Sequence, residues 1–177
     1  MGDLIRRENL MGLPVLSNYT GEQLGYIINV IFTPDNYRIS GIVINTKGLN
    51  TKGALISNKD IISLGRYAVI VSYPNEDSRI INTDNIGVSM IGARVLREDG
   101  YEIGKVSDIL IDSETGRVEG YEISKGFFDD FVQGRSFISC RLPYNNDMEA
   151  LIIGYNQQDD IKPYNKGIKN IFFNKLE

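Results

Sequence analysis

The sequence predicts an all-β protein that consists of two tandem small antiparallel β-barrels with short helical turns. Short runs rich in Val, Ile and Tyr alternate with Gly, Pro, Asn and Asp, which is the pattern of strands joined by turns. Residues 100–123 repeat the pattern of residues 21–44, with an offset of 79 (100 − 21 and 123 − 44). A chain of 177 residues therefore divides into two units of about 80 residues each.

The repeated segment is predicted to be a β-hairpin. In the second copy, the turn residues 112–116 separate two runs of strand-forming residues. We expect the Asp112 carboxylate to cap this turn and Gly116 to take the positive φ that closes it. In the first copy Tyr37 stands at the position of Gly116, so Asn36 is the expected left-handed residue there.

A Gly-x-x-x-Gly pattern opens each copy of the hairpin. Gly25 and Gly104 end this pattern, at residues 21–25 and 100–104. Closely spaced glycines also occur in dinucleotide-binding loops, but that motif opens a helix and no helical pattern follows here. We therefore expect both glycines to serve tight bends in a barrel.

The first unit is predicted to consist of short strands and one helical turn. The strand at 38–45 is apolar on both faces, which indicates cover on both sides or a place in a small closed barrel. Ser57 is the expected N-cap of the helical turn, and Gly65 is expected to end it. The segment 10–16 opens the unit and contains a short strand at 15–16, with Pro14 at its start or on an edge. The other expected elements are strands at 26–32, 38–45, 54–56 and 67–73, turns at 18–21 and 33–36, a loop at 47–53 and a helical turn at 58–62.

The second unit is predicted to repeat this order after a short linker. Its matching runs are 90–96, 101–123, 136–139 and 150–155, and an insertion at 125–135 lengthens one of its loops. The expected organisation is a first barrel at 1–77, a linker at 78–89, a second barrel at 90–158 and a tail at 159–177 that packs on a barrel or a partner.

Composition excludes several classes of function. The net charge of −4 argues against a nucleic-acid partner, for which a clustered basic surface is expected. The lone Cys140 cannot form an internal disulfide, which favours a reducing compartment, and we expect a buried, inert thiol rather than a reactive one. The start of the chain lacks the apolar core of a signal peptide, and no apolar run is long enough to span a bilayer. We therefore expect a cytoplasmic protein.

The chain contains no histidine, which removes the commonest general base and metal ligand. Ser-His and Cys-His nucleophile pairs are impossible within it, and one cysteine cannot build a zinc site. We expect no catalytic residue, no metal and no cofactor. Acidic pairs at 112/114, 129/130 and 159/160 could bind calcium or act in acid–base catalysis, but capped turns and a solvated face are the simpler interpretations.

Two aromatic segments are candidate partner contacts. Three phenylalanines lie within five positions of the 125–135 insertion, and the tail contains a second apolar run at 168–173. Either segment could cover its own barrel or form an exposed patch for a partner. The candidate contact residues are Phe127, Phe128, Phe131, Ile171, Phe172 and Phe173.

The doubled pattern of glycines, aliphatic residues, a turn, an arginine and a β-branched strand resembles the PRC-barrel family. That family includes the cytoplasmic domain of the photosynthetic reaction centre H subunit, the C-terminal domain of the ribosome-maturation factor RimM and many small bacterial proteins. The residues that carry the resemblance are Gly12, Pro14, Val15, Gly21, Gly25, Pro34, Arg38 and Val43, and then Gly92, Val95, Gly100, Gly104, Lys105, Asp108, Asp112, Gly116, Arg117 and Gly120.

The resemblance implies a strongly bent β-barrel for each half and a binding or assembly role, with no shared catalytic residues. Bound bacteriochlorophyll is not expected, because the chain has no histidine to ligate it. The first hypothesis is a non-enzymatic binding or scaffolding module of a bacterial cytoplasm, acting on an unknown protein partner or on itself. The alternatives are a small-ligand sensor that uses the cleft between the barrels and, with least support, a carboxylate hydrolase.

Overall fold

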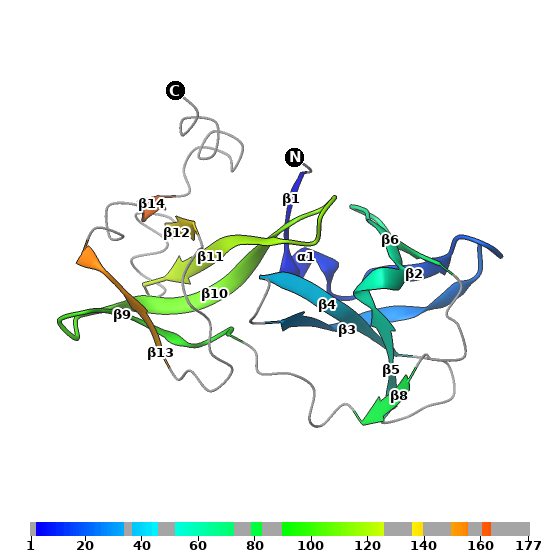
Figure 1. Cartoon of the computed structure of the whole chain (residues 1–177), viewed down its shortest axis with the longest axis horizontal. Coiled ribbons are helices and arrows are strands. Elements are labelled where there is room, and N and C mark those ends of the chain that lie inside the picture. Colours follow the sequence, from blue (N-terminus) through cyan, green and yellow to red (C-terminus); the bar gives the residue numbers. More distant parts are fainter. Residues whose placement is uncertain are drawn as a thin grey trace. The chain divides into compact units, whose positions relative to one another are not determined.

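The computed structural model describes residues 3–33, 37–45, 52–72, 79–82, 90–125, 136–139, 150–155 and 161–163 (Figure 1). The chain divides into two compact units. Unit 1 comprises Met1–Val88 together with Ile111–Val118, and unit 2 comprises Ser89–Leu110 together with Glu119–Glu177. Strands dominate both, so the predicted all-β class is confirmed. Within the described ranges, no helix is long and apolar enough to cross a membrane.

The central strands of unit 1 follow one another as an antiparallel meander. β2 (Pro14–Ser17) pairs with β3 (Gln23–Thr33), and β3 pairs with β4 (Arg38–Asn45). β4 then pairs with β5 (Lys52–Ser57). Register shifts within the β2–β3 and β3–β4 pairs mark bulges, which bend a sheet and increase its twist.

Shorter elements complete unit 1. β7 (Val69–Val71) pairs parallel with β2 and antiparallel with β6 (Ile61–Leu64), while β8 (Arg79–Asn82) pairs with β5. The order across the sheet is β6-β7-β2-β3-β4-β5-β8. β1 (Leu4–Arg6) pairs with β10 (Glu102–Asp112), and α1 (Arg7–Leu10) follows β1 directly.

Unit 2 has the same central arrangement. β9 (Arg94–Arg97) pairs antiparallel with β10 (Glu102–Asp112), β10 lies next to β11 (Val118–Ser124), and β11 pairs antiparallel with β12 (Ser136–Ser139). β13 and β14 lie at the two ends of the path β13-β9-β10-β11-β12-β14.

The strand order of unit 2 reproduces that of unit 1, which supports the sequence repeat. β13 (Ala150–Ile153) is parallel to β9 as β7 is parallel to β2, and β14 (Lys162–Pro163) pairs with β12 as β8 pairs with β5. The matched register pairs are Val15–Gly25 and Val95–Gly104, Val15–Val69 and Val95–Leu151, and Gly41–Ser57 and Gly120–Ser139. The predicted pair of tandem barrels is therefore confirmed, with one parallel pair in each.

Each unit has its own apolar core. In β4 every residue from Ile39 to Ile44 except Ser40 is buried, so this strand is covered on both faces as its sequence predicts. The largest fully buried side chains are Leu10, Ile27, Ile39, Ile42 and Ile111 in unit 1, and Ile109, Leu110, Ile123, Phe137, Ile138, Leu151 and Ile153 in unit 2.

The segment after β5 differs from the expected helical turn. Asn58–Asp60 forms a 3₁₀ helix, shorter than the predicted turn, and Ser57 stands at its N-cap position as predicted but makes no side-chain capping hydrogen bond. The chain returns to extended backbone at Ile61 because β6 pairs with β7, with Leu64 opposite Val69. Tertiary pairing of an apolar run therefore overrides the local helical signal.

Candidate functional site

The glycines of the repeated pattern lie where two strands approach closely. A Cβ atom added to Gly25 would collide with the carbonyl oxygen of Asn45, and one added to Gly104 would collide with that of Ser124. The two contacts are equivalent, because Ser124 lies 79 positions after Asn45 (124 − 45). The structure therefore gives these glycines a packing role, with a neighbouring backbone in the space of the missing side chain.

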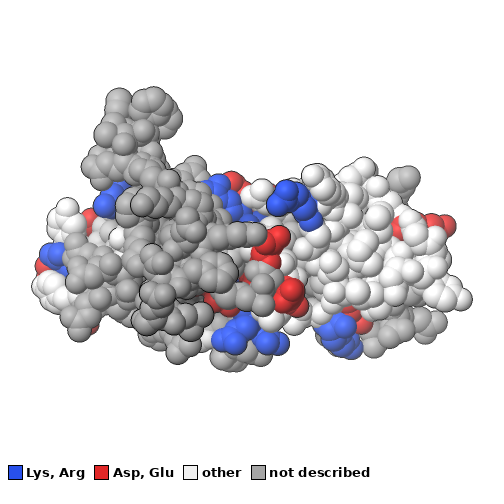
Figure 2. Space-filling model, turned by 90° about the horizontal axis from the view of Figure 1, so that it is seen from above, with Lys and Arg blue, Asp and Glu red and all other residues white. Residues whose placement is uncertain are grey.

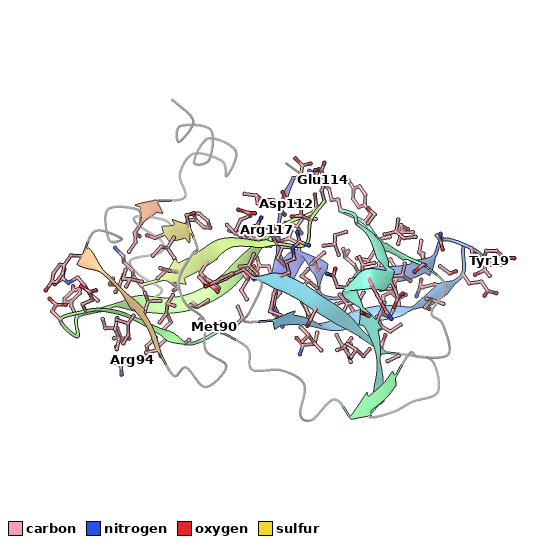
Figure 3. All side chains as sticks on the ribbon, viewed as in Figure 1. Tyr19, Met90, Arg94, Asp112, Glu114 and Arg117 are labelled. Carbon is pink, nitrogen blue, oxygen red and sulfur yellow. The ribbon has the colours of Figure 1, made fainter. Side chains whose placement is uncertain are left out.

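The second hairpin turns around the carboxylate of Asp112. Its Oδ1 atom accepts hydrogen bonds from the backbone N–H of Glu114 (3.1 Å), the backbone N–H of Thr115 (2.8 Å) and the Thr115 hydroxyl (2.9 Å). Gly116 has a φ of 67°, and its N–H donates to the Asp112 carbonyl oxygen over 2.8 Å. Asp112, Glu114 and Arg117 gather at this end of the hairpin in Figure 3. The acidic residues here thus build a turn.

The end of this hairpin pairs with the turn of the first hairpin inside unit 1. The N–H of Ile39 donates to the carbonyl oxygen of Gly116 over 2.9 Å, and the N–H of Val118 donates to that of Tyr37 over 2.7 Å. Adding 79 to 37 and 39 gives 116 and 118, so the two bonds exchange equivalent positions of the repeat. The two repeats therefore contact each other through equivalent positions, in the way that identical subunits do in an isologous interface.

Tyr37 adopts the conformation that its sequence position did not predict. Its φ is 49°, so Tyr37 itself is left-handed. The expectation that another residue of the first turn takes the left-handed conformation in place of Tyr37 is therefore wrong. Its carbonyl oxygen is held by the N–H of Val118, a contact between distant parts of the sequence. An isolated antiparallel bridge between Arg38 and Arg117 lies at the centre of the pairing.

The aromatic candidate contacts lie outside the described residues. This holds for Phe127, Phe128 and Phe131 of the insertion and for Ile171, Phe172 and Phe173 of the tail, and also for Cys140. Their roles stay predictions. Two of the acidic pairs, 129/130 and 159/160, are also outside the described ranges. Among the residues that the structure describes, no three His, Cys, Asp or Glu side chains are grouped so as to hold a metal ion.

A cluster of one arginine, one aspartate and two tyrosines stands out on unit 2. The Arg97 guanidinium lies 5.1 Å from the ring centroid of Tyr101 and 5.0 Å from that of Tyr155. Its Nε and Nη2 atoms donate to the two carboxylate oxygens of Asp99, at 2.8 and 2.6 Å. The exposed fractions of Tyr101 and Tyr155 are 62% and 55%. We call these four residues the arginine–tyrosine cluster.

Two kinds of contact fix the geometry of this cluster. The bidentate ion pair orients the planar guanidinium, and both tyrosine rings lie close enough to it for cation–π attraction. The backbone N–H of Tyr101 donates to Asp99 over 3.1 Å, which ties the carboxylate to the start of the next strand. The hydrogen bond from Arg97 holds the pKa of Asp99 well below its usual range, and hydrogen bonding to Asp99 raises the pKa of Tyr155.

The cluster was not found from the sequence because its parts are far apart. Tyr155 follows Arg97 by 58 positions (155 − 97), and the two meet because β13 runs parallel to β9, with Ile153 opposite Arg97. The sequence nevertheless contained two observations from which the cluster could have been predicted. The segment 97–101 reads Arg-Glu-Asp-Gly-Tyr, and the repeat aligned the strand at 150–155 with the strand that neighbours β2 in the first unit.

A buried carboxylate on β11 is a second candidate for chemistry. Glu122 is fully buried, and its Oε1 atom accepts a hydrogen bond from the Ser107 hydroxyl over 3.0 Å. Asp108 is also buried, and its Oδ1 accepts from the N–H of Ile109 over 2.8 Å. Neither carboxylate is open to solvent, so a substrate could not reach it in this conformation. These acids are structural in the described state.

Charged groups on the face drawn in Figure 2 are interspersed, with acidic and basic side chains close to one another. On unit 2, Arg94 donates through Nε and Nη2 to the same oxygen of Glu102, at 2.9 and 2.7 Å. Such exposed pairs contribute little to stability. The arginine–tyrosine cluster differs from them because its cation also lies within 5.1 Å of the centroids of two aromatic rings.

Comparison with known families supplies the identity of the fold. A sequence model described as the PRC-barrel domain matches residues 2–78 and, a second time, residues 87–156. The chain belongs to the PRC-barrel family. A comparison with curated proteins gave no match.

The second PRC-barrel match and the compact units divide the chain differently. Ile111–Val118 lies within the second match, yet it belongs to unit 1 in space. The arginine–tyrosine cluster, in contrast, lies in both the second match and unit 2. The family assignment therefore places the cluster on the second PRC barrel and shows that the second repeat contributes a hairpin end to unit 1.

Proposed function

We propose that this PRC-barrel protein is a non-enzymatic protein-binding module that contacts its partner through the arginine–tyrosine cluster. The observation that carries the proposal is the Arg97 guanidinium, which lies 5.1 Å and 5.0 Å from the ring centroids of the exposed Tyr101 and Tyr155. Tyrosine and arginine are the residue types that dominate binding hot spots in protein interfaces. A bacterial cytoplasmic scaffold is the role that the family resemblance and the single cysteine support.

The cluster suits binding because its side chains are ordered before a partner arrives. Immobilising a long side chain on association costs about 0.5–1.5 kcal/mol. The ion pair with Asp99 already restricts Arg97, so less conformational freedom is lost when a partner covers it. The partner that fits is a protein surface with apolar groups for the tyrosine rings and acceptors for the guanidinium edge and the phenol groups.

Site-specific photocrosslinking tests this site directly. A photoreactive phenylalanine analogue replaces Tyr101 or Tyr155 in the full chain, and matched variants carry it at Tyr19 or Tyr67, which are 85% and 80% exposed. Tyr19 projects from its loop in Figure 3. We expect one stoichiometric adduct from the cluster positions only. Equal yields from all four positions would contradict the proposal.

Affinity measurements on the captured partner then separate this site from the aromatic insertion. Arg97→Ala and Tyr101→Ala are expected to weaken binding by about 2 kcal/mol or more, as truncation of hot-spot residues does. Phe128→Ala and Phe131→Ala test the competing sequence-based site. If only the phenylalanine variants lose affinity, the binding role stands but the cluster is not its site. If the purified chain turns over a substrate, the non-enzymatic role is wrong.

A further inference from the structure

The hairpin end Ile111–Val118 belongs to unit 1 in space. It is separated from the rest of unit 1 in the sequence by residues 89–110, which belong to unit 2. Figure 1 shows this end of the β10–β11 hairpin beside β1, in agreement with the pairing of β1 and β10. Unit 1 is therefore completed by a segment that the chain delivers from its second repeat.

Backbone hydrogen bonds help to hold this segment on unit 1. The N–H of Ser113 donates to the carbonyl oxygen of Asp3 over 3.0 Å, in addition to the two bonds that join the hairpin turns. Ile111, Gly116 and Val118 are buried in this position. Every one of these donors, acceptors and apolar surfaces exists in identical form on any second copy of the chain.

We propose that the Ile111–Val118 hairpin end also docks in trans, onto unit 1 of a second copy, and so produces a two-chain exchanged form. When each chain gives its hairpin end to the other, both units keep all the hydrogen bonds described above, and the assembly closes as a symmetric dimer. The partner is a second copy because the docked surface is already complementary to this segment. The proposal does not depend on the arginine–tyrosine cluster.

The balance between the two forms depends on chain concentration. Within one chain, the connection between the repeats tethers the hairpin end to its docking surface, and a short tether gives an effective concentration in the millimolar range. The closed monomer therefore dominates in dilute solution. Refolding at about 1 mM chains should populate the exchanged dimer, whereas refolding at about 1 µM should not.

An engineered disulfide reports which chain supplies the hairpin end. Arg38 and Arg117 face each other in the bridge with their neighbours' N–H groups donating across it, so they form a non-hydrogen-bonded antiparallel pair. The Cα atoms of such a pair lie about 4.5 Å apart, within the range of disulfides. The test protein is the full chain with Arg38→Cys, Arg117→Cys and Cys140→Ser. The controls carry only one of the two new cysteines.

Refolding at the two concentrations, mild oxidation and non-reducing electrophoresis then give the result. We expect an internal disulfide at about 1 µM and, at about 1 mM, a covalent dimer fraction at least tenfold higher, with 38–117 peptides linked between chains. A dimer fraction that does not rise above that of the single-cysteine controls would overturn the proposal. If the variant with Arg38→Cys alone formed as much covalent dimer, the proposal would also be overturned. That dimer would join the first hairpin turns of two chains, rather than a first turn to a second.

The native chain provides a second measurement that needs no substitution. Chains labelled with ¹⁵N and unlabelled chains are unfolded in urea, mixed at about 1 mM and refolded together, at the effective concentration expected of the tether. Native mass spectrometry should detect mixed dimers that persist on dilution, since exchange back requires release of the hairpin ends. Mixed dimers that dissociate at once, or no dimers, would contradict the exchanged form.

Discussion

Tyr37 and Gly116 occupy equivalent positions of the two repeats, and both are left-handed, with φ angles of 49° and 67°. Their carbonyl oxygens accept hydrogen bonds from Val118 and Ile39, so each turn is held by the strand that follows the other. A left-handed conformation costs a residue other than glycine roughly 1–2 kcal/mol. Two backbone hydrogen bonds worth about 0.5–1.5 kcal/mol each can offset that cost at Tyr37.

Gly116→Val should destabilise the protein by about 1–3 kcal/mol, because a β-branched residue is strained at positive φ. An added Cβ itself would meet no overlap, since it would lie 3.7 Å from the Asn58 Oδ1 atom and 3.9 Å from the Ile39 Cβ atom. Urea unfolding measures the change. Gly116→Asn is the control and should cost less, because asparagine tolerates this conformation. An equal loss in both variants would contradict the argument from φ.

Gly120→Ala should be more damaging than Gly116→Val. We expect it to lower the free energy of unfolding by at least about 3 kcal/mol, because overpacking here forces both the backbone and a ring to move. A Cβ would collide with the Ile138 carbonyl oxygen and with the ring of Phe137. Gly12→Ala is the matched control, since Gly12 has a φ of 77° but open space around it. Its expected loss is roughly 1–2 kcal/mol. The reverse order of the two urea midpoints would show that the strand spacing at Gly120 is not as described.

Asp112→Ala should cost about 2–3 kcal/mol, as expected for losing hydrogen bonds to a buried charged acceptor. The substitution leaves the N–H groups of Glu114 and Thr115 and the Thr115 hydroxyl without the Oδ1 acceptor that binds all three. Asp112→Asn keeps one side-chain oxygen, so we expect about half the loss. Thermal unfolding of the two variants distinguishes these outcomes. If alanine and asparagine were equally harmless, the carboxylate would not hold the turn.

The repeat, the strands and the turns could be predicted because their signals are local. Alternating apolar residues determine which side of a strand is buried, and the glycines at 25 and 104 mark places where another backbone occupies the space of a side chain. The same signals recur at a constant offset, so the sequence pattern of one hairpin allowed the other hairpin to be predicted. The helical turn predicted at 58–62 is only a 3₁₀ helix at Asn58–Asp60, because β6 pairing, a tertiary effect, decides how the chain continues.

Features that depend on contacts between distant segments could not be predicted. The left-handed Tyr37 is maintained by Val118, and nothing in the residues around Tyr37 indicates that partner. The arginine–tyrosine cluster depends in the same way on the parallel pairing of β13 with β9. The transfer of Ile111–Val118 to unit 1 is also a property of the tertiary structure, because its sequence is that of an ordinary hairpin turn.

The ion pair of the arginine–tyrosine cluster predicts a particular acid dependence of stability. The hydrogen bond from Arg97 holds the pKa of Asp99 below its usual range in the folded state, whereas an unfolded aspartate titrates near about 3.9. A lowered folded pKa means that the ionised carboxylate stabilises the fold above the unfolded pKa. This contribution is lost as the pH falls from about 4 toward the folded pKa.

Asp99→Asn removes this titration, so it separates the contribution of Asp99 from those of the other acids. We expect a constant difference in urea midpoint between the native chain and Asp99→Asn from about pH 5 to pH 8, and a difference that shrinks below about pH 4, where Asp99 begins to protonate in the unfolded chain. The control is the same comparison in an Arg97→Gln background, where the cation that lowers the pKa is absent and the acid dependence of the difference should largely disappear. A difference that stays constant down to pH 2 in the native background would show that the Asp99 carboxylate is not held by Arg97 in solution. The guanidinium would then lack the ion pair that orients it between Tyr101 and Tyr155.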